Sequence, residues 1–251
     1  MRATTSLPDR PVFGIDGGMH LTRSLTLVAL IGSTGCGLSH SGDGNVVDQT
    51  RTVSAFSKVA IAGGLPAAIT AGPTSVVTHL DSNLQQYVEA IVENEVLTIR
   101  PINGEDVNPS AGALIRVTNP RIEGIELSGG VVATAQTSSV ALLLLEASGG
   151  SQLDCSNIRS DKVQIELSGG STAKLAGQAR ALKIDASGGS KLTSALPTED
   201  LEINASGGST VDANASNSIT AELSGGSKGT IGGDPSFKVV VTSGGSELSY
   251  R

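Results

Sequence analysis

The sequence predicts an all-β fold, namely a single-stranded right-handed parallel β-helix of about seven rungs preceded by a less regular β-rich part. The first observation is that Ser-Gly-Gly occurs seven times, with 18 to 20 residues from one serine to the next. The second is that apolar residues occupy every second position on both sides of the tripeptide, which is the period of a β-strand. The third is that aromatic residues make up only 2% of the chain, so the core must be narrow and built from Val, Ile, Leu and Ala.

Each rung is expected to contain a strand, a Gly-Gly bend, a second strand and a polar return to the next rung. Glycine suits such a bend because it adopts positive φ and allows close backbone approach. One rung cannot bury its apolar positions, whereas stacked rungs can, at a spacing of about 4.8 Å. We expect right-handed winding, the usual hand of parallel connections. The positions expected to point inward include Ile125, Leu145, Ile165, Ile184, Ile203, Ala221 and Val240 before the bends, and Leu153, Ala173, Leu192, Val211, Leu175 and Ile231 after them.

The repeats fill residues 121–251, and residues 51–120 lack the tripeptide but are rich in short apolar runs typical of strands. The stretch YVEAIVENEVLTIR, at 87–100, is typical of a hairpin that turns at Asn94-Glu95. We expect residues 51–120 to form the first irregular rungs and to cap the end of the solenoid, as terminal repeats must.

Residues 1–36 predict an export signal. An apolar run from Leu25 to Ile31 follows Arg23 and precedes small residues and Cys36. The run is too short to cross a bilayer as a helix. A start at Met19 would give a signal of more ordinary length.

This leader resembles that of a bacterial lipoprotein, in which the cysteine is lipidated and becomes the new N-terminus. Ser33 departs from the pattern, because leucine is usual at that position. A plain secretory signal cut nearby, with Cys36 incidental, is the alternative. We expect an exported protein anchored through Cys36 at the outer membrane or cell surface, with residues 37–50 as a flexible tether.

Composition and motifs give no sign of catalysis or nucleic-acid binding. The net charge is −7, whereas binding phosphates requires basic patches. The three histidines, His20, His40 and His79, lack metal-ligand spacing. We therefore expect no enzyme, no cofactor and no dedicated metal site. Cys155 lies in an apolar column and is expected to be a buried free thiol.

One column of acidic residues is the candidate site. Two positions before successive serines stand Glu126, Glu146, Glu166 and Asp185, followed by Asn204 and Glu222. Strand alternation directs this column outward, so carboxylates would stack on successive rungs. Such a ladder either is a solvated surface feature that discourages wrong pairing or binds a cation or a basic partner weakly.

The stretch from RTVSAFSKVAIAGG to YVEAIVENEVLTI, followed by the Ser-Gly-Gly rungs, resembles the head-GIN-domain family of putative autotransporter adhesins. The similarity covers about Arg51 to Tyr250 and includes Phe56, Asp81 and Asn83. It implies a β-helical exported protein with a role in adhesion or envelope organisation, and an unknown envelope or surface partner. It supplies no catalytic residues. A polysaccharide-binding or polysaccharide-cleaving β-helix and a self-assembling filament protein are the alternatives.

Overall fold

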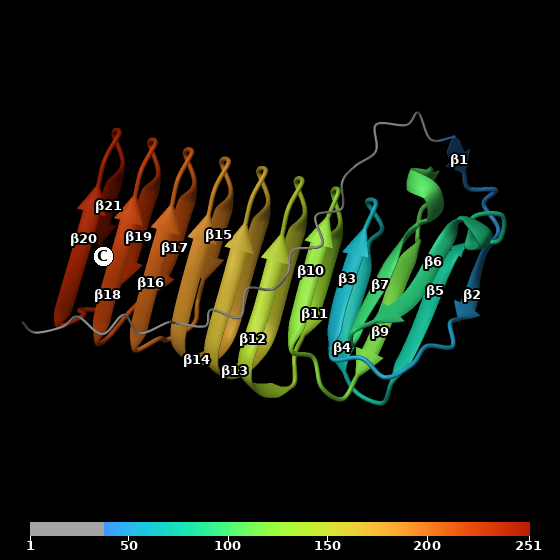
Figure 1. Cartoon of the computed structure of the whole chain (residues 1–251), viewed down its shortest axis with the longest axis horizontal. Helices are drawn as coiled ribbons and strands as arrows, with labels where there is room; N and C mark the ends of the chain where they lie inside the picture. Colours follow the sequence, from blue (N-terminus) through green and yellow to red (C-terminus); the bar gives the residue numbers. More distant parts are fainter. Residues whose placement is uncertain (1–37) are drawn as a thin grey trace, which may run out of the picture. The chain divides into compact units, whose positions relative to one another are not determined.

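The computed structural model describes residues 38–251, which form a β-solenoid made of two facing stacks of parallel strands (Figure 1). The front stack contains, in spatial order, β7 (Val96–Pro101), β3 (Lys58–Ala62), β10 (Gly124–Ser128), β12 (Ser139–Ala147), the second halves of β13 (Gln152–Leu167) and β14 (Thr172–Ala186), β16 (Asp200–Ala205), β18 (Ser218–Leu223) and β20 (Phe237–Thr242). The back stack contains β9 (Leu114–Asn119), β4 (Ala67–Ala71), β11 (Val132–Gln136), the first halves of β13 and β14, β15 (Lys191–Ser194), β17 (Thr210–Asn214), β19 (Lys228–Gly232) and β21 (Glu247–Tyr250). The predicted parallel β-solenoid of about seven repeats is therefore confirmed.

The core lies between the two stacks and follows the predicted apolar columns. Ile125, Leu145, Ile165, Ile184, Ile203 and Ala221 are all buried in the front stack, and Leu153, Ala173, Leu192, Val211, Leu175 and Ile231 are buried in the back stack. Val240, in the last rung, is the exception and is exposed. Each inward residue packs on its copies in the adjacent rungs, so the apolar columns join into one hydrophobic core between the two stacks.

The Gly-Gly bends form one edge of the solenoid and lie in line along the top of Figure 1. Both glycines of each bend have positive φ, for example +61° at Gly169 and +77° at Gly170. The amide of the residue after the bend donates to the carbonyl of the serine before it, at 3.3 Å for Ser171 and Ser168. Positive φ at both central residues, with this hydrogen bond, is the pattern of a type I′ turn.

The two glycines of a bend serve different purposes. A Cβ on Gly169 would lie 3.1 Å from the backbone nitrogen of Gly149 in the preceding rung, and the same contact recurs at every stacked bend. A Cβ on Gly170 would meet nothing within 4 Å. The first glycine therefore permits close stacking of rungs, while the second is needed only for its backbone conformation.

A buried serine follows most of the bends, and the sequence analysis did not predict it. The hydroxyl of each of these serines donates to the carbonyl of the serine three residues earlier, as Ser171 Oγ does to Ser168 at 2.8 Å. The members of this column are Ser151, Ser171, Ser190, Ser209 and Ser227, all essentially inaccessible to solvent. Since the hydroxyl is satisfied within its own turn, a polar group can lie in the core at little cost.

The N-terminal part forms one more regular rung and a cap. Ala62-Gly63-Gly64 is an eighth bend of the same kind, since Gly63 and Gly64 have φ of +83° and +72° and β3 and β4 pair with β10 and β11. The predicted hairpin is confirmed as β6 (Val88–Glu93) paired antiparallel with β7, with positive φ at Asn94 and Glu95. β5 (Ser75–Asp81) pairs antiparallel with β9. These antiparallel strands cover the N-terminal edges of both stacks.

The prediction of a flexible tether was wrong for the described part of residues 37–50. β1 (Ser39–Ser41) pairs in parallel with β8 (Asp106–Asn108), and β2 (Val46–Thr50) pairs antiparallel with β5. Asp81 accepts hydrogen bonds from the amides of Gly44 and Ser110, both at 2.8 Å, and Asn83 Nδ2 donates to the Ser41 carbonyl at 2.9 Å. Glycine and serine content suggested flexibility, but backbone pairing and two polar side chains from the domain order this segment.

Two short 3₁₀ helices, η1 (Gln85–Tyr87) and η2 (Ile102–Gly104), complete the described elements. Within residues 38–251, no helix is long and apolar enough to cross a membrane. The predicted export signal and its Cys36 lie outside the described residues.

The unequal roles of the two glycines give a direct prediction. We expect Gly170→Ala to lower the free energy of unfolding by about 1 to 2 kcal/mol, the cost of left-handed backbone for a residue with a Cβ. Gly169→Ala carries the same conformational cost and also pushes a methyl group onto the backbone of the preceding rung. It should therefore be the more destabilising change, by at least about 1 kcal/mol. Urea denaturation of the full chain measures both values.

Asparagine provides the control, because it tolerates left-handed backbone better than alanine does. Gly170→Asn should be milder than Gly170→Ala, whereas Gly169→Asn should not rescue Gly169→Ala. Equal losses for the alanine changes at both positions would contradict the proposed stacking role of the first glycine.

Candidate functional site

The acidic column lies on the outer face of the front stack, and the structure pairs its members in register. Glu126 pairs with Glu146, Glu146 with Glu166, and Glu166 with Asp185. Their neighbours along each strand are buried, so the carboxylates point outward as strand alternation requires. We call these four residues the acidic ladder. Adjacent members lie about one strand spacing, roughly 4.8 Å, apart.

Partial burial, with stacking as a second cause at Glu146, raises the pKa of two members of the ladder. Burial, together with the neighbouring charges of Glu126 and Glu166, raises the pKa of Glu146 to about 7, although Lys58 acts in the opposite direction. Burial also raises the pKa of Glu126. Near neutral pH, Glu146 is therefore partly protonated, and the N-terminal half of the ladder carries less negative charge than its two carboxyls imply.

In the C-terminal half of this face, two of the carboxylates have specific partners. Asn204 Nδ2 donates to Asp185 Oδ1 at 2.8 Å, so the interruption of the ladder satisfies its last carboxylate. Lys183 Nζ contacts Glu202 Oε1 at 2.5 Å in the adjacent outward column. The hydrogen bond to Glu202 is the main cause that raises the pKa of Lys183, against the effect of burial.

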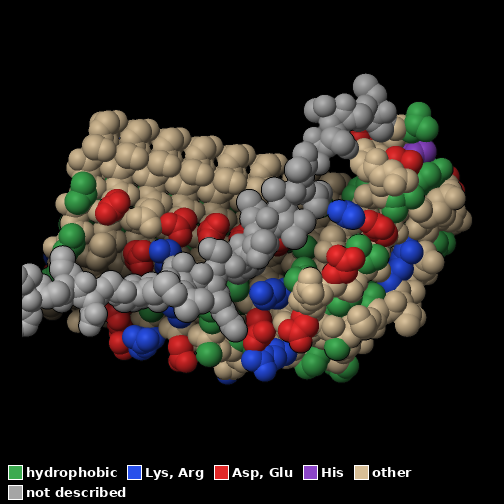
Figure 2. Space-filling view, viewed as in Figure 1, with side chains coloured by type: hydrophobic (Ala, Val, Ile, Leu, Met, Phe, Trp, Pro, Cys, Tyr) green, Lys and Arg blue, Asp and Glu red, His purple; other side chains and the backbone are tan. Residues whose placement is uncertain are grey.

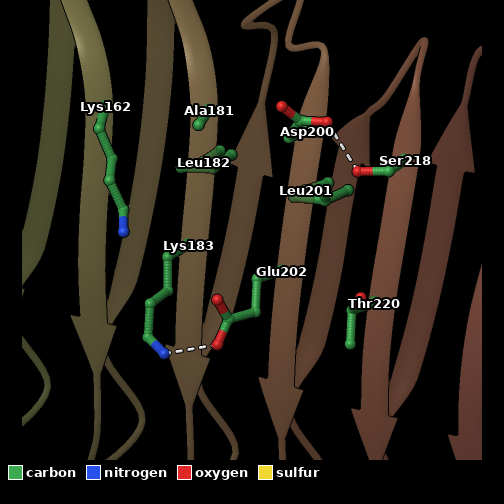
Figure 3. Close-up of a pocket in the computed structure, with 9 residues that line it drawn as sticks. All are labelled: Lys162, Ala181, Leu182, Lys183, Asp200, Leu201, Glu202, Ser218 and Thr220. Atoms are coloured by element: carbon green, nitrogen blue, oxygen red, sulfur yellow. Dashed lines mark hydrogen bonds and ion pairs between the residues drawn. The ribbon is translucent and has the colours of Figure 1, made fainter. Parts of the chain in front are cut away.

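Two adjoining hollows open on the outer face of the front stack, where short side chains replace long ones. The first has a volume of about 250 Å³ and is shown in Figure 3, where Lys183 and Glu202 point toward one another and Asp200 points toward Ser218. The second, of about 420 Å³, lies closer to the Gly-Gly edge and contains Asp185 of the ladder. Its lining also includes Asn204, Glu222, Val241 and the serines Ser187, Ser206, Ser224 and Ser243.

Three apolar side chains of β20 lie on the outer face, which the sequence analysis missed. Phe237, Val239 and Val241 are exposed, with 62% of Phe237 accessible. They pair with Ser218, Thr220 and Glu222 of β18, all outward-facing positions. Figure 2 shows hydrophobic side chains at the β20 end of the face in view, beside acidic and basic side chains and below the edge formed by the bends. The sequence could have predicted this exposure, since all three residues occupy positions of the repeat whose side chains point outward.

Other residues considered for chemistry lie apart from this face. Cys155 is buried and unpaired as predicted, and burial raises the pKa of its thiol to about 12, so it has little thiolate character. His79 contacts Asp48 at 2.6 Å, and His40 stacks on Tyr87 with ring centroids 3.7 Å apart. In residues 38–251, no group of three or more His, Cys, Asp or Glu side chains is arranged to hold a metal ion. Cation binding by the acidic ladder stays a prediction.

The raised pKa of Glu146 makes stability depend on pH. Between the ordinary value of 4.5 and the folded value of about 7, the folded protein binds more protons than the unfolded chain. The stabilising contribution of this group is therefore complete below about pH 4.5 and is lost as pH rises to about 7. We expect the melting temperature of Glu146→Gln to exceed that of the wild type at pH 8, with a smaller difference at pH 5.

Glu222→Gln is the matched control, because Glu222 is an exposed member of the same outward column next to Asn204. Its pH profile should follow the wild type. If Glu146→Gln also follows the wild type from pH 5 to 8, the carboxyl of Glu146 does not titrate in this range.

Known proteins share this architecture. The model of the family described as "putative auto-transporter adhesin, head GIN domain" matches residues 55–235. A putative adhesin from Bacteroides fragilis is 18% identical, with a TM-score of 0.76 over 84% of this chain and 100% of that one. A putative lipid binding protein from Parabacteroides distasonis is 14% identical, with a TM-score of 0.68 over 85% and 99% of the two chains.

A putative adhesin from Parabacteroides merdae is 16% identical, with a TM-score of 0.59 over 85% of this chain and 99% of that one. At these identities the solved structures share the fold alone. No curated protein matches the sequence. The family match covers well over half of the chain and includes the cap, the eighth bend and six of the seven Ser-Gly-Gly bends. The chain therefore belongs to the putative auto-transporter adhesin, head GIN domain family.

Proposed function

We propose that this protein is an exported, lipid-anchored envelope protein without catalytic activity, which mediates adhesion or organises the envelope through the outer face of its front stack. Membership of an adhesin-like family supports a surface role. The observation that carries the proposal furthest is the regular outer face, on which aligned side chains repeat from rung to rung. A repeating surface can make many equivalent weak contacts with a repeating partner, and such contacts multiply in avidity.

The capped N-terminal end of the solenoid favours a discrete surface protein over a head-to-tail filament. β6 covers the free edge of β7, and β5 covers that of β9, each in antiparallel pairing. A second copy cannot continue the parallel stacks at those edges without displacing the cap. Natural β-proteins commonly protect edges in this way against uncontrolled pairing.

Adhesion itself is tested by attachment of cells. We compare cells of the bacterium that makes this protein with and without its gene. Cells that lack the protein should attach less well, to their own cell-wall fraction or to the surfaces that the bacterium colonises, than cells complemented with the full chain. A complemented strain carrying Ile165→Asp, which places a charge in the core and should unfold the domain, serves as the control. Equal attachment by all three strains would overturn the proposed role.

The anchor is tested through Cys36. Stable membrane attachment requires more than one acyl chain, as a lipidated N-terminal cysteine can provide. We expect the wild-type protein to fractionate with membranes, and Cys36→Ser to appear in the soluble fraction or as an uncleaved precursor. Cys155→Ser controls for loss of a thiol. Identical fractionation of wild type and Cys36→Ser, with a mature N-terminus elsewhere, would contradict lipidation.

A further inference from the structure

The geometry points to a binding trough for a neutral oligosaccharide on the front stack, formed by the two hollows and bordered by Phe237. This inference deepens the proposed function and rests on it, since it names the class of ligand through which the outer face would adhere. We call this surface the front trough. It is defined by Ala181, Lys183, Asp185, Asp200, Glu202, Asn204, Ser218, Thr220, Glu222, Phe237 and Val241.

The shape of the trough follows from the order of side chains on four rungs. The hollows share β14, β16 and β18, and the second begins two residues further along each strand than the first ends. Their floors contain the small or buried residues Ala181, Leu182 and Leu201 in the first and Ala186 and Ala205 in the second. Together they run along the strands from the polar return toward the Gly-Gly edge, and they extend across several rungs spaced about 4.8 Å apart.

The polar groups of the trough match the hydroxyl groups of a sugar, which both donate and accept hydrogen bonds. Asp200 Oδ1 already accepts from Ser218 Oγ at 2.7 Å and from Asn217 Nδ2 at 2.9 Å, so its position is fixed. Glu202 is held by Lys183, and Asp185 by Asn204. Fixed donors and acceptors lower the ordering cost of binding.

The charge of the trough selects against acidic glycans. Four carboxylates, from Asp185, Asp200, Glu202 and Glu222, line the two hollows, against two ammonium groups from Lys162 and Lys183. A polyanionic saccharide would meet a surface on which carboxylates outnumber ammonium groups, and the like charges would repel it. A neutral sugar avoids this repulsion, and three of the four carboxylates already have fixed partners: Glu202 contacts Lys183, Asp185 accepts from Asn204, and Asp200 accepts from Ser218.

Phe237 adds the apolar surface that a sugar ring needs. It pairs in register with Ser218, which lines the first hollow, and its ring is largely exposed. Val241 lines the second hollow on the same strand. An aromatic ring beside a few positioned polar groups is the usual composition of a small-ligand site, since the ring packs on C–H groups while the polar groups fix orientation.

The test is binding of full-length protein to an immobilised panel of neutral oligosaccharides of glucose, galactose, mannose and N-acetylglucosamine, with an acidic uronic-acid oligosaccharide as the charge control. We expect at least one neutral member to bind and the acidic one not to bind. Phe237→Ala and Ala181→Trp should each weaken that binding by at least about tenfold, the first by removing the apolar wall and the second by filling the hollow.

Matched controls lie on the back stack. Val132→Ala removes another exposed apolar side chain, and Thr193→Trp adds the same bulk at an exposed position. Both should bind like the wild type, and circular dichroism melting should show that all four variants are folded. Absence of binding to every neutral member overturns the inference, as does equal binding by the front and back variants.

The same variants in the cell-attachment assay separate the two proposals. If cells still attach while no neutral oligosaccharide binds, the inference of a sugar-binding trough is wrong and the proposed adhesive role holds. Loss of attachment in Phe237→Ala and Ala181→Trp, but not in the back-stack controls, would support both proposals. Absence of attachment in the wild type would overturn the adhesive role itself.

Discussion

The close approach of one Gly-Gly bend to the next is the constraint on which the rest of the structure depends. A Cβ on the first glycine of a bend would lie 3.0 to 3.3 Å from backbone nitrogen in the preceding rung, from Gly129 through Gly244. Only glycine permits this contact together with positive φ. Because the bends stack in register, strands on both sides of them also stack in register, and each residue lies above its counterpart in the repeat.

In-register stacking determines both the core and the outer surface. Apolar residues at the inward positions stack into columns from rung to rung. A chain with very few aromatic residues therefore still buries a continuous core. The same alignment places carboxylate next to carboxylate on the outer face, and burial together with these neighbouring charges raises the pKa of Glu146. Farther along the solenoid the sequence relieves this repulsion with Asn204 and with the Lys183–Glu202 pair. The proposed binding surface lies in this compensated half.

The repeat could be predicted from the sequence because Ser-Gly-Gly marks each bend and period-two alternation marks each face. The eighth bend was missed because Ala62 stands where the other bends have serine, although Gly63 and Gly64 keep the same backbone. The buried serine column was missed because serine is normally exposed, and only the turn geometry shows where its hydroxyl is satisfied. The hollows depend on the relative lengths of side chains on adjacent rungs, which no single repeat reveals.

Amide hydrogen exchange at the bends tests the central claim most directly. If stacked, hydrogen-bonded turns hold the rungs in register, the amides of Ser151, Ser171, Ser190, Ser209 and Ser227 should be strongly protected. Their free energies of opening should match those of the core-strand amides beside them, because bend and strands open together. Exchange of these serine amides at the rate of an unstructured peptide, with the strand amides still protected, would show that the bends are passive connections and would contradict the account.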